Sequence, residues 1–385
     1  MRVAWITRSF LDYRIPVFRE LDQLLDQQLT LTFNGEYVPE TVRDKAVGAL
    51  GDRAYPLSGE RKLGGEDQHH LANRNFSLRY QPGLRRHIQT LRPDVMVCDG
   101  FFKWTLPAMV HRIRSGTPLV ILYERTAHTE RRAQWIRTSF RKAVVKVTDA
   151  MGCSGRLCQE YTETLGMDPG RITLGHMSAD TDGLRTAVRA IQPSEREATR
   201  ARLGLRGTVF LYVGRMDPRK GCRELLRAWA QAAIPPQEGT LLMVGDGPER
   251  SELEEMPEAS GVVFAGRIPY DELPAIYAAA DAFVIATLED NWSLVVPEAM
   301  ACELPILSSI YNGCWPELVR DGQNGWAFDP LRTEDCARAL KNAVDASPRL
   351  ASMGHRSGEI IADFGARQAA ESIKRACEIA IAYRG

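Results

Sequence analysis

The chain has 385 residues, of which 44% are hydrophobic and 25% are charged, as is ordinary for a globular protein. Its 49 Lys and Arg residues balance its 49 Asp and Glu residues, so the composition gives no reason to expect nucleic acid as a partner. No apolar run approaches the roughly 18 residues that a membrane-spanning helix needs, and the first residues show no signal-peptide pattern. We therefore expect a cytoplasmic protein of two domains.

The eight cysteines are scattered through the chain. The closest pair, Cys153 and Cys158, has no second pair at a spacing that would complete a metal site. We therefore expect reduced thiols and no bound metal.

The first half of the chain alternates predicted strands and predicted helices. Strands are expected at residues 2–7, 29–33, 94–100, 118–124 and 149–155. Helices are expected at residues 16–25, 83–93, 103–116 and 156–166. This alternation predicts a parallel sheet with right-handed crossovers.

The second half repeats this plan after a charged helix that begins near residue 192. Strands are expected at residues 208–214, 240–244, 262–268, 281–287 and 305–309. The fold class is therefore α/β, with two doubly wound domains in tandem. We predict a first domain over residues 1–190, a second over residues 191–365 and a final helical segment over residues 366–385.

The stretch from residue 281 to residue 305 combines a buried strand, a polar loop and a helix start. Asp290 lies in the loop, and Pro297 and Glu298 follow where the helix should begin. In an open α/β sheet, ligands bind where strands end and helices begin. Backbone N–H groups there suit phosphate and carboxylates suit hydroxyls, so the stretch predicts a site for a phosphorylated sugar.

The loop after the strand at residues 208–214 carries Arg215 and Lys220. A departing nucleoside diphosphate gains negative charge as its bond to the sugar breaks. Two fixed cations stabilise that charge most strongly in the transition state. Arg219 lies beside Lys220, and we expect it to be less important.

Together these two segments resemble the donor-site motifs of retaining GT-B glycosyltransferases, family 4 in particular. The first motif, Gly-Arg, a four-residue spacer and Lys-Gly, is matched by Arg215 and Lys220. The second is Glu, seven residues and Glu, continuing into Ala-Met-Ala and Pro. Its matching residues here are Glu298, Ala299, Met300, Ala301 and Pro305. The chain departs from the pattern at the first acid, where Asp290 or its neighbour Glu289 could fill the role, and at Ser293, where the family has Gly.

The resemblance implies two Rossmann-like domains that face a cleft, with the final helix crossing back to the first domain. It implies that a hexosyl unit passes from a nucleotide-diphosphate sugar, the co-substrate, to an acceptor hydroxyl, with retention and with no required cofactor or metal. The expected catalytic residues are Arg215, Lys220, Asp290 and His128. The expected donor-binding residues are Gly214, Arg267, Ile268, Glu289, Asn291, Trp292, Ser293, Leu294, Val295 and Glu298.

Individual roles follow from the same resemblance. Glu298 would bind the ribose hydroxyls, and the N–H groups of Leu294 and Val295 would bind phosphate. Arg267 and Ile268 follow a strand end that lies near the nucleobase in the family. The acceptor side is expected to include four residues near strand ends of the first domain, namely Asp12, Tyr13, Arg14 and Asp99.

Two other functions remain open. One is a different GT-B enzyme, such as a sugar-nucleotide epimerase, and the other is a non-catalytic protein that binds sugar nucleotides. Residues 125–146 also carry seven basic residues with interleaved apolar ones. A helix with such a composition can lie at an anionic membrane surface, although it can equally pack its apolar face on its own sheet.

Overall fold

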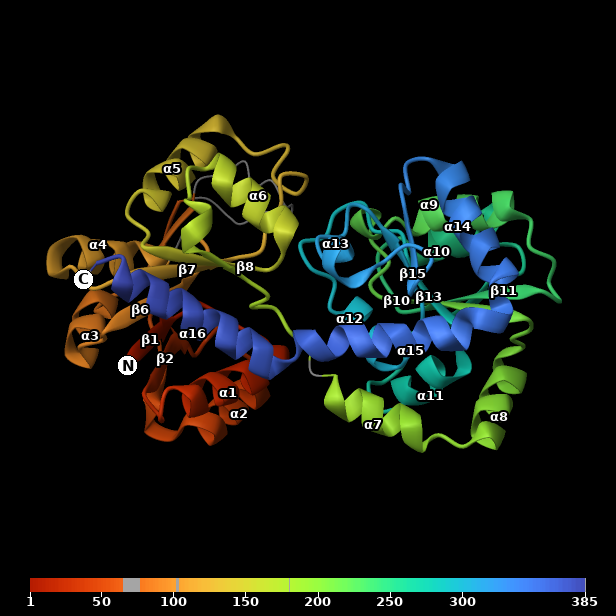
Figure 1. Ribbon diagram of the computed structural model, residues 1–385, viewed down its shortest axis with the longest axis horizontal. Helices are drawn as coiled ribbons and strands as arrows, with labels where there is room; N and C mark the ends of the chain where they lie inside the picture. Colours follow the sequence, from red (N-terminus) through yellow and green to blue (C-terminus); the bar gives the residue numbers. More distant parts are fainter. Residues whose placement is uncertain (65–76, 102–103, 180, 385) are drawn as a thin grey trace. The chain divides into compact units, whose positions relative to one another are not determined.

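The computed structural model describes residues 1–64, 77–101, 104–179 and 181–384. The chain forms two compact units, called unit 1 and unit 2 here (Figure 1). Unit 1 contains Met1–Ser178 and the residues from Ala366 onward, and unit 2 contains Ala179–Gly365. The boundary that we placed near residue 190 falls at the end of helix α7 (Asp182–Ala190). That helix contacts α11 and α12 of unit 2, which explains why unit 2 begins before it.

Unit 1 is built on a seven-stranded parallel sheet with the order β3-β2-β1-β6-β7-β8-β9. Its strands are β1 (Val3–Ile6), β2 (Leu29–Asn34), β3 (Ala54–Leu57), β6 (Val95–Asp99), β7 (Leu119–Tyr123), β8 (Ala150–Cys153) and β9 (Ile172–Leu174). A separate antiparallel hairpin consists of β4 (Arg61–Gly64) and β5 (Ser77–Tyr80). The central strands are almost wholly apolar and buried, as expected when helices cover both faces of a parallel sheet.

The helices of unit 1 are α1 (Ile15–Leu24), α2 (Glu40–Leu50), α3 (Leu84–Leu91), α4 (Thr105–Ser115), α5 (Trp135–Val145), α6 (Arg156–Thr164) and α16 (Ala366–Ala382). The last helix, α16, packs along α1 and against β6, β7 and β8 (Figure 1). Ala369, Ile373, Ala376 and Ala380 recur at helical spacing and are fully buried in the core that contains Trp5. The C-terminal helix therefore completes unit 1.

Unit 2 is built on a six-stranded parallel sheet with the order β12-β11-β10-β13-β14-β15. Its strands are β10 (Thr208–Val213), β11 (Gly239–Val244), β12 (Val263–Gly266), β13 (Ala282–Ile285), β14 (Ile306–Ser309) and β15 (Gly325–Phe328). Its helices are α7, α8 (Pro193–Leu203), α9 (Cys222–Ala232), α10 (Arg250–Glu254), α11 (Leu273–Ala279), α12 (Val295–Ala301), α13 (Trp315–Leu318), α14 (Thr333–Asp345) and α15 (Leu350–Ile361). Large buried side chains such as Phe210, Tyr212 and Phe283 fill its interior.

The order of strands reverses at β10. From β10 the chain proceeds outward through β11 and β12, and it then returns to place β13 on the other side of β10. The loops that follow β10 and β13 therefore leave the same edge of the sheet as neighbours. This is the position at which open α/β sheets bind ligands.

Candidate functional site

The loops after β10 and β13 meet through their backbones. The Arg219 carbonyl accepts hydrogen bonds from the N–H groups of Leu288 (2.7 Å) and Glu289 (3.2 Å), and from Thr287 Oγ1 (3.0 Å). Gly221 has a φ of +64°, and a Cβ at this position would lie 2.0 Å from the carbonyl oxygen of Ala286. Only glycine fits this junction, because any side chain would overlap the neighbouring loop.

The two predicted motifs are joined by an ion pair. Lys220 Nζ lies 2.5 Å from Asp290 Oδ2. Ser293 Oγ donates to the same carboxylate oxygen at 2.5 Å, and the backbone N–H of Trp292 donates to Asp290 Oδ1 at 3.2 Å. Asp290 therefore fixes the position of the Lys220 ammonium group, and Ser293, which replaces the expected glycine, supports that arrangement. Glu289 is half-buried next to this pair.

Arg215 is the more exposed of the two predicted cations. Its side chain is 70% exposed and lies 3.7 Å from the carboxylate of Asp217. The same carboxylate pairs with Arg219 at 3.2 Å and accepts the Arg219 N–H at 3.0 Å. Tyr212 donates its hydroxyl to the Arg215 carbonyl at 2.9 Å. Asp217 and Tyr212 thus hold the loop that carries the cations, and sequence reasoning missed both because neither belongs to a distinct pattern.

The turn at Gly245 and Gly247, which follows β11, supports the cation loop from the other side. A Cβ on Gly245 would lie 1.9 Å from the Gly214 carbonyl, and one on Gly247 would lie 2.1 Å from the Met216 carbonyl. The turn is therefore a tight structural contact with the loop that begins at Gly214. Arg267 and Ile268 follow β12, farther along the same edge, and Arg267 is exposed.

Glu298 lies in the first turn of α12. Tyr277, a fully buried residue of α11, donates its hydroxyl to Glu298 Oε2 at 3.2 Å. Burial raises the pKa of Glu298 to about 7, although the Tyr277 hydrogen bond acts in the opposite direction. A carboxyl group with this pKa changes its charge near neutral pH. Sequence reasoning missed Tyr277, because it lies within an otherwise apolar helical run.

The remaining residues of the second motif have different surroundings. Leu294 and Val295 are the N-cap and the first residue of α12, where backbone N–H groups lack helical acceptors. Asn291 is half-buried beside Asp290. Trp292, which we expected to face the donor sugar, is only 5% exposed, and its ring lies 6.5 Å from that of Phe364. Its side chain therefore packs within unit 2, where the distant segment that carries Phe364 approaches the ring.

In unit 1, the strand ends bring three of the four predicted acceptor residues together. Asp99 ends β6 and accepts a hydrogen bond from Trp5 Nε1 at 3.2 Å. Arg14 is buried and donates to the His176 carbonyl at 3.3 Å. Burial lowers the pKa of Arg14, but the charges of Asp99, Tyr13 and Glu124 outweigh it, so the pKa lies above its ordinary value. Burial also raises the pKa of Tyr13.

Asp12 is not part of that cluster. Its carboxylate is exposed and forms an ion pair with Lys45 of α2 at 2.9 Å. The side chain thus points to the surface of unit 1, and this geometry gives no support to the predicted acceptor role of Asp12. His128 lies half-buried in the turn after β7, where its carbonyl accepts a hydrogen bond from Arg131. Its catalytic role stays a prediction.

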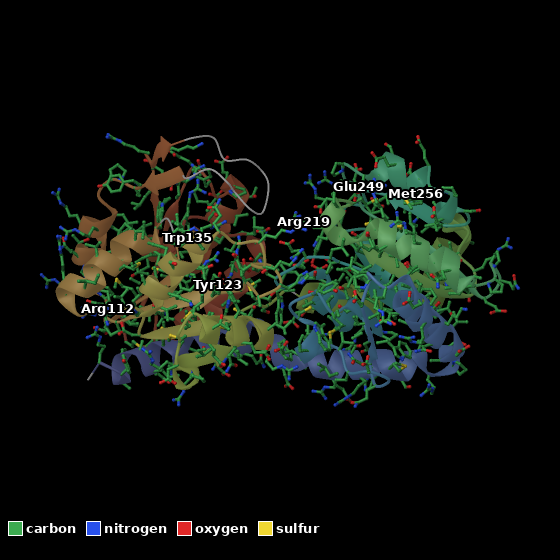
Figure 2. The ribbon with its side chains drawn as sticks, turned by 90° about the horizontal axis from the view of Figure 1, so that it is seen from above. Arg112, Tyr123, Trp135, Arg219, Glu249 and Met256 are labelled. Atoms are coloured by element: carbon green, nitrogen blue, oxygen red, sulfur yellow. The ribbon has the colours of Figure 1, made fainter. Side chains whose placement is uncertain are left out.

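The basic segment at residues 125–146 is divided between core and surface. Arg141 is buried and pairs with Glu130 at 2.7 Å, and Arg125 pairs with the same carboxylate at 2.8 Å. Trp135, labelled in Figure 2, begins α5 with its side chain 76% exposed, and Ile136 is 60% exposed. The C-terminal half of α5 therefore packs on unit 1, and its first turn presents apolar side chains to solvent.

All eight cysteines lie in the described residues, and all are buried free thiols. Within the described parts of the chain, no group of three or more His, Cys, Asp or Glu side chains is arranged to hold a metal ion. No described helix has both the length and the apolar character needed to cross a bilayer.

The chain resembles known proteins in both sequence and structure. Residues 207–346 match the family model described as glycosyl transferases group 1. D-inositol 3-phosphate glycosyltransferase of Rhodococcus jostii (strain RHA1) is 32% identical over 233 residues, which cover 57% of this chain and 49% of that protein. The match thus spans about half the length of this relative. The 2-deoxystreptamine glucosyltransferase of Streptomyces kanamyceticus is 28% identical over 313 residues, covering 79% of this chain and 74% of that protein.

Among solved structures, Anabaena Alr3699/HepE in complex with UDP superimposes with a TM-score of 0.74 at 17% sequence identity. The superposition covers 97% of this chain and 99% of the Anabaena chain. At this identity the likeness concerns the fold. The chain therefore has the fold of the GT-B glycosyltransferases, and its residues 207–346 are similar to the glycosyl transferases group 1 family.

Proposed function

We propose that the protein is a retaining glycosyltransferase that transfers a hexosyl unit from a nucleotide-diphosphate sugar to an acceptor hydroxyl. The observation that carries this proposal is the junction of the loops after β10 and β13. There, Lys220 pairs with Asp290 at 2.5 Å, Arg215 extends from the same loop, and Glu298 lies in the helix that follows. Cations for a diphosphate and carboxylates for hydroxyls thus meet at one edge of the sheet.

In the proposed mechanism, Arg215 and Lys220 bind the diphosphate and stabilise the charge that develops as it leaves. The N–H groups of Leu294 and Val295 add hydrogen-bond donors for phosphate. Glu298 accepts hydrogen bonds from the ribose hydroxyls. The first-acid role falls to Asp290 or to Glu289 in this proposal, and Asp290 also accepts hydrogen bonds from Lys220, Trp292 and Ser293.

The proposal includes retention through a front-face reaction, in which the leaving phosphate receives the proton of the acceptor hydroxyl. The new glycosidic bond then forms on the face from which the diphosphate departs. No metal is required, because Arg215 and Lys220 supply the positive charge. UDP is the first nucleotide to test, since the Anabaena protein with this fold was solved with UDP and with UDP-glucose.

The acceptor is a hydroxyl compound that we place at the strand ends of unit 1. Tyr13, Arg14 and Asp99 form a partly buried polar cluster there, and Asp99 Oδ1 has no hydrogen-bond partner among the described residues. The names of two relatives specify D-inositol 3-phosphate and 2-deoxystreptamine, both of which carry ring hydroxyls. We therefore propose a polyhydroxylated ring as the first acceptor class to test. The exposed first turn of α5 is proposed as a peripheral membrane contact.

The test begins with thermal unfolding in the presence of UDP, GDP, ADP and dTDP, because a ligand that binds only the folded state raises the melting temperature. The sugar forms of the stabilising nucleotide are then incubated with the protein, and the products are followed by NMR. Slow release of a free sugar whose anomeric configuration matches the donor supports a retaining transferase. Release with inverted configuration contradicts retention.

The same experiment separates the alternatives. An epimerase would convert the donor sugar to its epimer, and NMR would detect that change directly. A non-catalytic binding protein would show nucleotide stabilisation without any change in the donor or in a panel of hydroxyl acceptors. Activity that persists after dialysis against a chelator would support metal independence, and activity that returns only with added Mg²⁺ or Mn²⁺ would contradict it.

A further inference from the structure

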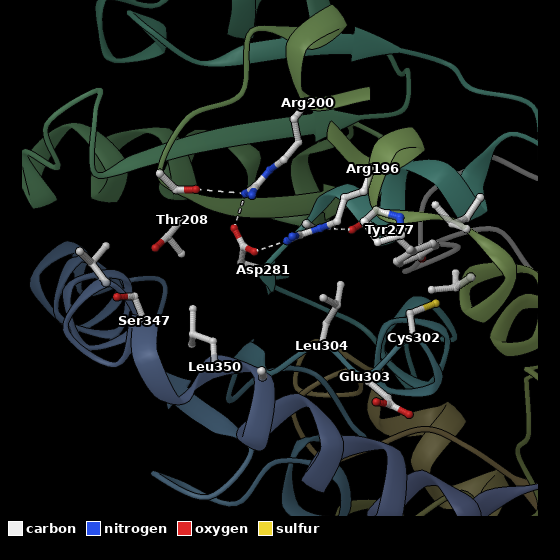
Figure 3. A pocket seen from close by; sticks show the side chains of 18 of the residues that line it. Arg196, Arg200, Thr208, Tyr277, Asp281, Cys302, Glu303, Leu304, Ser347 and Leu350 are labelled. Carbon is white, nitrogen blue, oxygen red and sulfur yellow. Dashed lines mark hydrogen bonds and ion pairs between the residues drawn. The ribbon is translucent and has the colours of Figure 1, made fainter. Parts of the chain in front are cut away.

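A cavity of about 860 Å³ lies in unit 2 (Figure 3). It is at the opposite end of the strands from the candidate donor site. Thr208 begins β10, Asp281 precedes β13 and Leu304 precedes β14, and all three line the cavity. The amino ends of the strands therefore form its floor. A cavity of this volume is large enough for a small organic molecule.

One side of the cavity carries more hydrogen-bond donors than acceptors. Arg196 Nη2 lies 2.6 Å from Asp281 Oδ1, and Arg200 Nη2 pairs with Asp281 Oδ2 (Figure 3). The N–H of Val209 donates to Asp281 Oδ2 at 2.8 Å, so the carboxylate accepts three hydrogen bonds from the protein. Two guanidinium groups thus share one carboxylate. Among the described residues, the buried Nε of Arg200 has no hydrogen-bond partner, and an anion on this side of the cavity would supply an acceptor for the guanidinium groups.

The opposite side of the cavity is mostly apolar, with Ser347 and with Glu303, whose carboxylate is paired with Arg189, as its polar residues. Aliphatic side chains from α7 and the residue after it, from the segment before β14, from α14 and from α15 line this side. They are Val188, Ile191, Leu304, Val344, Leu350 and Ala351. An occupant that satisfies both sides would have an anionic group at one end and a short hydrocarbon body at the other.

The side chain of Tyr277 lies between the cavity and the candidate donor site. Tyr277 lines the cavity, and its hydroxyl donates to Glu298 Oε2 at 3.2 Å. Cys302, which also lines the cavity, lies at the end of α12 and donates its N–H to the Glu298 carbonyl at 3.1 Å. A molecule in the cavity would therefore contact the residue that positions the Glu298 carboxyl group.

We propose that this cavity is an effector site for a small amphipathic anion, a carboxylate or phosphate with a short apolar body. The anion binds to Arg196 and Arg200, and the apolar body packs on the aliphatic side. Occupancy changes the affinity of the donor site through Tyr277. This coupling rests on the proposed function, whereas binding in the cavity does not.

The binding test uses octanoate and octyl phosphate as probes in isothermal titration calorimetry without nucleotide. Inorganic phosphate lacks the apolar body and octyl glucoside lacks the charge, so each should bind at least tenfold more weakly. The Ala351→Trp variant fills the cavity from an exposed position on α15 and should abolish probe binding. Ser352→Trp is the matched control, because Ser352 is the next exposed residue of the same helix and does not line the cavity.

The coupling test measures UDP affinity with and without saturating octanoate. We expect a change of about fivefold or more, the lower end of typical couplings between sites. In Tyr277→Phe the ring remains but the hydroxyl is lost, so the probe should still bind while its effect on UDP disappears.

Three results would overturn the proposal. They are the absence of saturable binding at millimolar octanoate, equal binding by Ala351→Trp and the unaltered protein, and an unchanged UDP affinity. The octanoate titration alone tests the cavity, and the UDP titration alone tests the donor site. A failure of one proposal is therefore distinguishable from a failure of the other.

Discussion

The two units share one architecture, but the carboxyl edges of their sheets are held together differently. In unit 2, the loops after β10, β11 and β13 touch through backbone atoms, at distances that only glycines such as Gly221 and Gly245 permit. In unit 1, the edge is held by side chains, with Trp5 bonded to Asp99 and Arg14 buried near them. A backbone junction fixes the positions of whole loops, whereas a side-chain cluster can change one residue at a time.

This difference suits two kinds of substrate recognition. The diphosphate is the same in every nucleotide-diphosphate sugar, so a rigid site with fixed cations can be retained whatever sugar is bound. Acceptors differ in shape and hydrogen-bonding groups, and an edge assembled from side chains can be adapted to each. We therefore expect substitutions at the loop junction of unit 2 to affect the whole candidate donor site, and substitutions at the strand ends of unit 1 to affect only the contacts of the substituted residue.

The largest effect is expected from adding one methyl group at the unit 2 junction. In Gly221→Ala the new Cβ would lie 2.0 Å from the Ala286 carbonyl oxygen, in a left-handed backbone conformation. Together the overlap and the conformation should cost roughly 2–4 kcal/mol. We expect a lower melting temperature and the loss of UDP-induced stabilisation.

Gly100→Ala is the matched change in unit 1. Gly100 follows β6 with a φ of +72°, but a Cβ there would have nothing within 4 Å. Only the conformational cost of about 1–2 kcal/mol remains. Thermal unfolding and UDP titration of both variants test the comparison, and equal losses in the two would show that the backbone junction has no special role.

The next effect concerns the cations. Lys220→Ala and Arg215→Ala should each lower turnover by roughly two orders of magnitude, as does the removal of a single oxyanion donor. Binding of the nucleoside without phosphates should change little, because both cations are assigned to the diphosphate. Initial rates of donor hydrolysis or transfer provide the measurement.

Arg219→Ala is the control for these variants. Its carbonyl holds the loop junction, but its side chain bonds only to Asp217 among the contacts described, and that carboxylate would keep Arg215 as a partner. We expect a small change in turnover. If Arg219→Ala were as damaging as Lys220→Ala, the assignment of the two cations would be wrong.

The same contrast between the units explains what could be predicted from the sequence. The central strands and the two-domain fold were predictable, because buried parallel strands are continuous apolar runs that alternate with helices. The edge strands β3 and β15 were not predicted, because they are short and lack such a run. The two loops that the Lys220–Asp290 ion pair joins were each assigned to the donor site from the sequence, because each motif lies in one contiguous loop, and the roles of these residues stay a prediction. The boundary at Ala179 and the links from Tyr277 to Glu298 and from Arg14 to His176 were not predictable, because they depend on packing between distant segments. The surroundings of Asp12 and Trp292 differ from those expected for the same reason. Asp12 pairs with Lys45 and Trp292 packs near Phe364, and both partners lie far away in sequence.

A moderate effect is expected from Glu298→Gln. Loss of a charge-assisted hydrogen bond to the ribose should weaken UDP-glucose binding by about 1.5–3 kcal/mol. Since burial raises the pKa of Glu298 to about 7, binding should strengthen as the pH rises from 6 to 8 and the carboxylate forms. The diphosphate of UDP-glucose keeps its charge over this range, so titration calorimetry isolates the protein's contribution. Glu298→Gln should bind with little dependence on pH.

The same carboxyl group makes a prediction for the protein without ligand. Its pKa is higher in the folded state than in the unfolded state, so the folded state binds the proton more tightly between about pH 4.5 and 7. Stability should therefore fall as the pH rises through this window. Glu298→Gln should remove this part of the decline, and thermal unfolding at several pH values would detect the change. An identical pH profile in the variant would contradict the raised pKa.

The smallest effect is expected on the surface of unit 1, where α5 begins. Trp135 and Ile136 are 76% and 60% exposed, and Arg132 and Lys142 are exposed near them along the chain. If this turn contacts anionic membranes, Trp135→Ser with Ile136→Ser should reduce partitioning into anionic vesicles by roughly three- to tenfold. Binding of the unaltered protein should also fall as salt is added, because surface charges are screened.

Ile113→Ser is the control for this last experiment, because Ile113 of α4 is 61% exposed in the same unit but lies outside the basic segment. Its partitioning should match that of the unaltered protein. If any exposed apolar residue attracted lipid, Ile113→Ser would also partition less strongly than the unaltered protein. Co-sedimentation with vesicles of increasing anionic content distinguishes the two cases. No binding to anionic vesicles at low salt would contradict the proposed membrane contact and favour a dissolved acceptor. The buried Arg141 and the C-terminal half of α5 would then serve only the packing of unit 1.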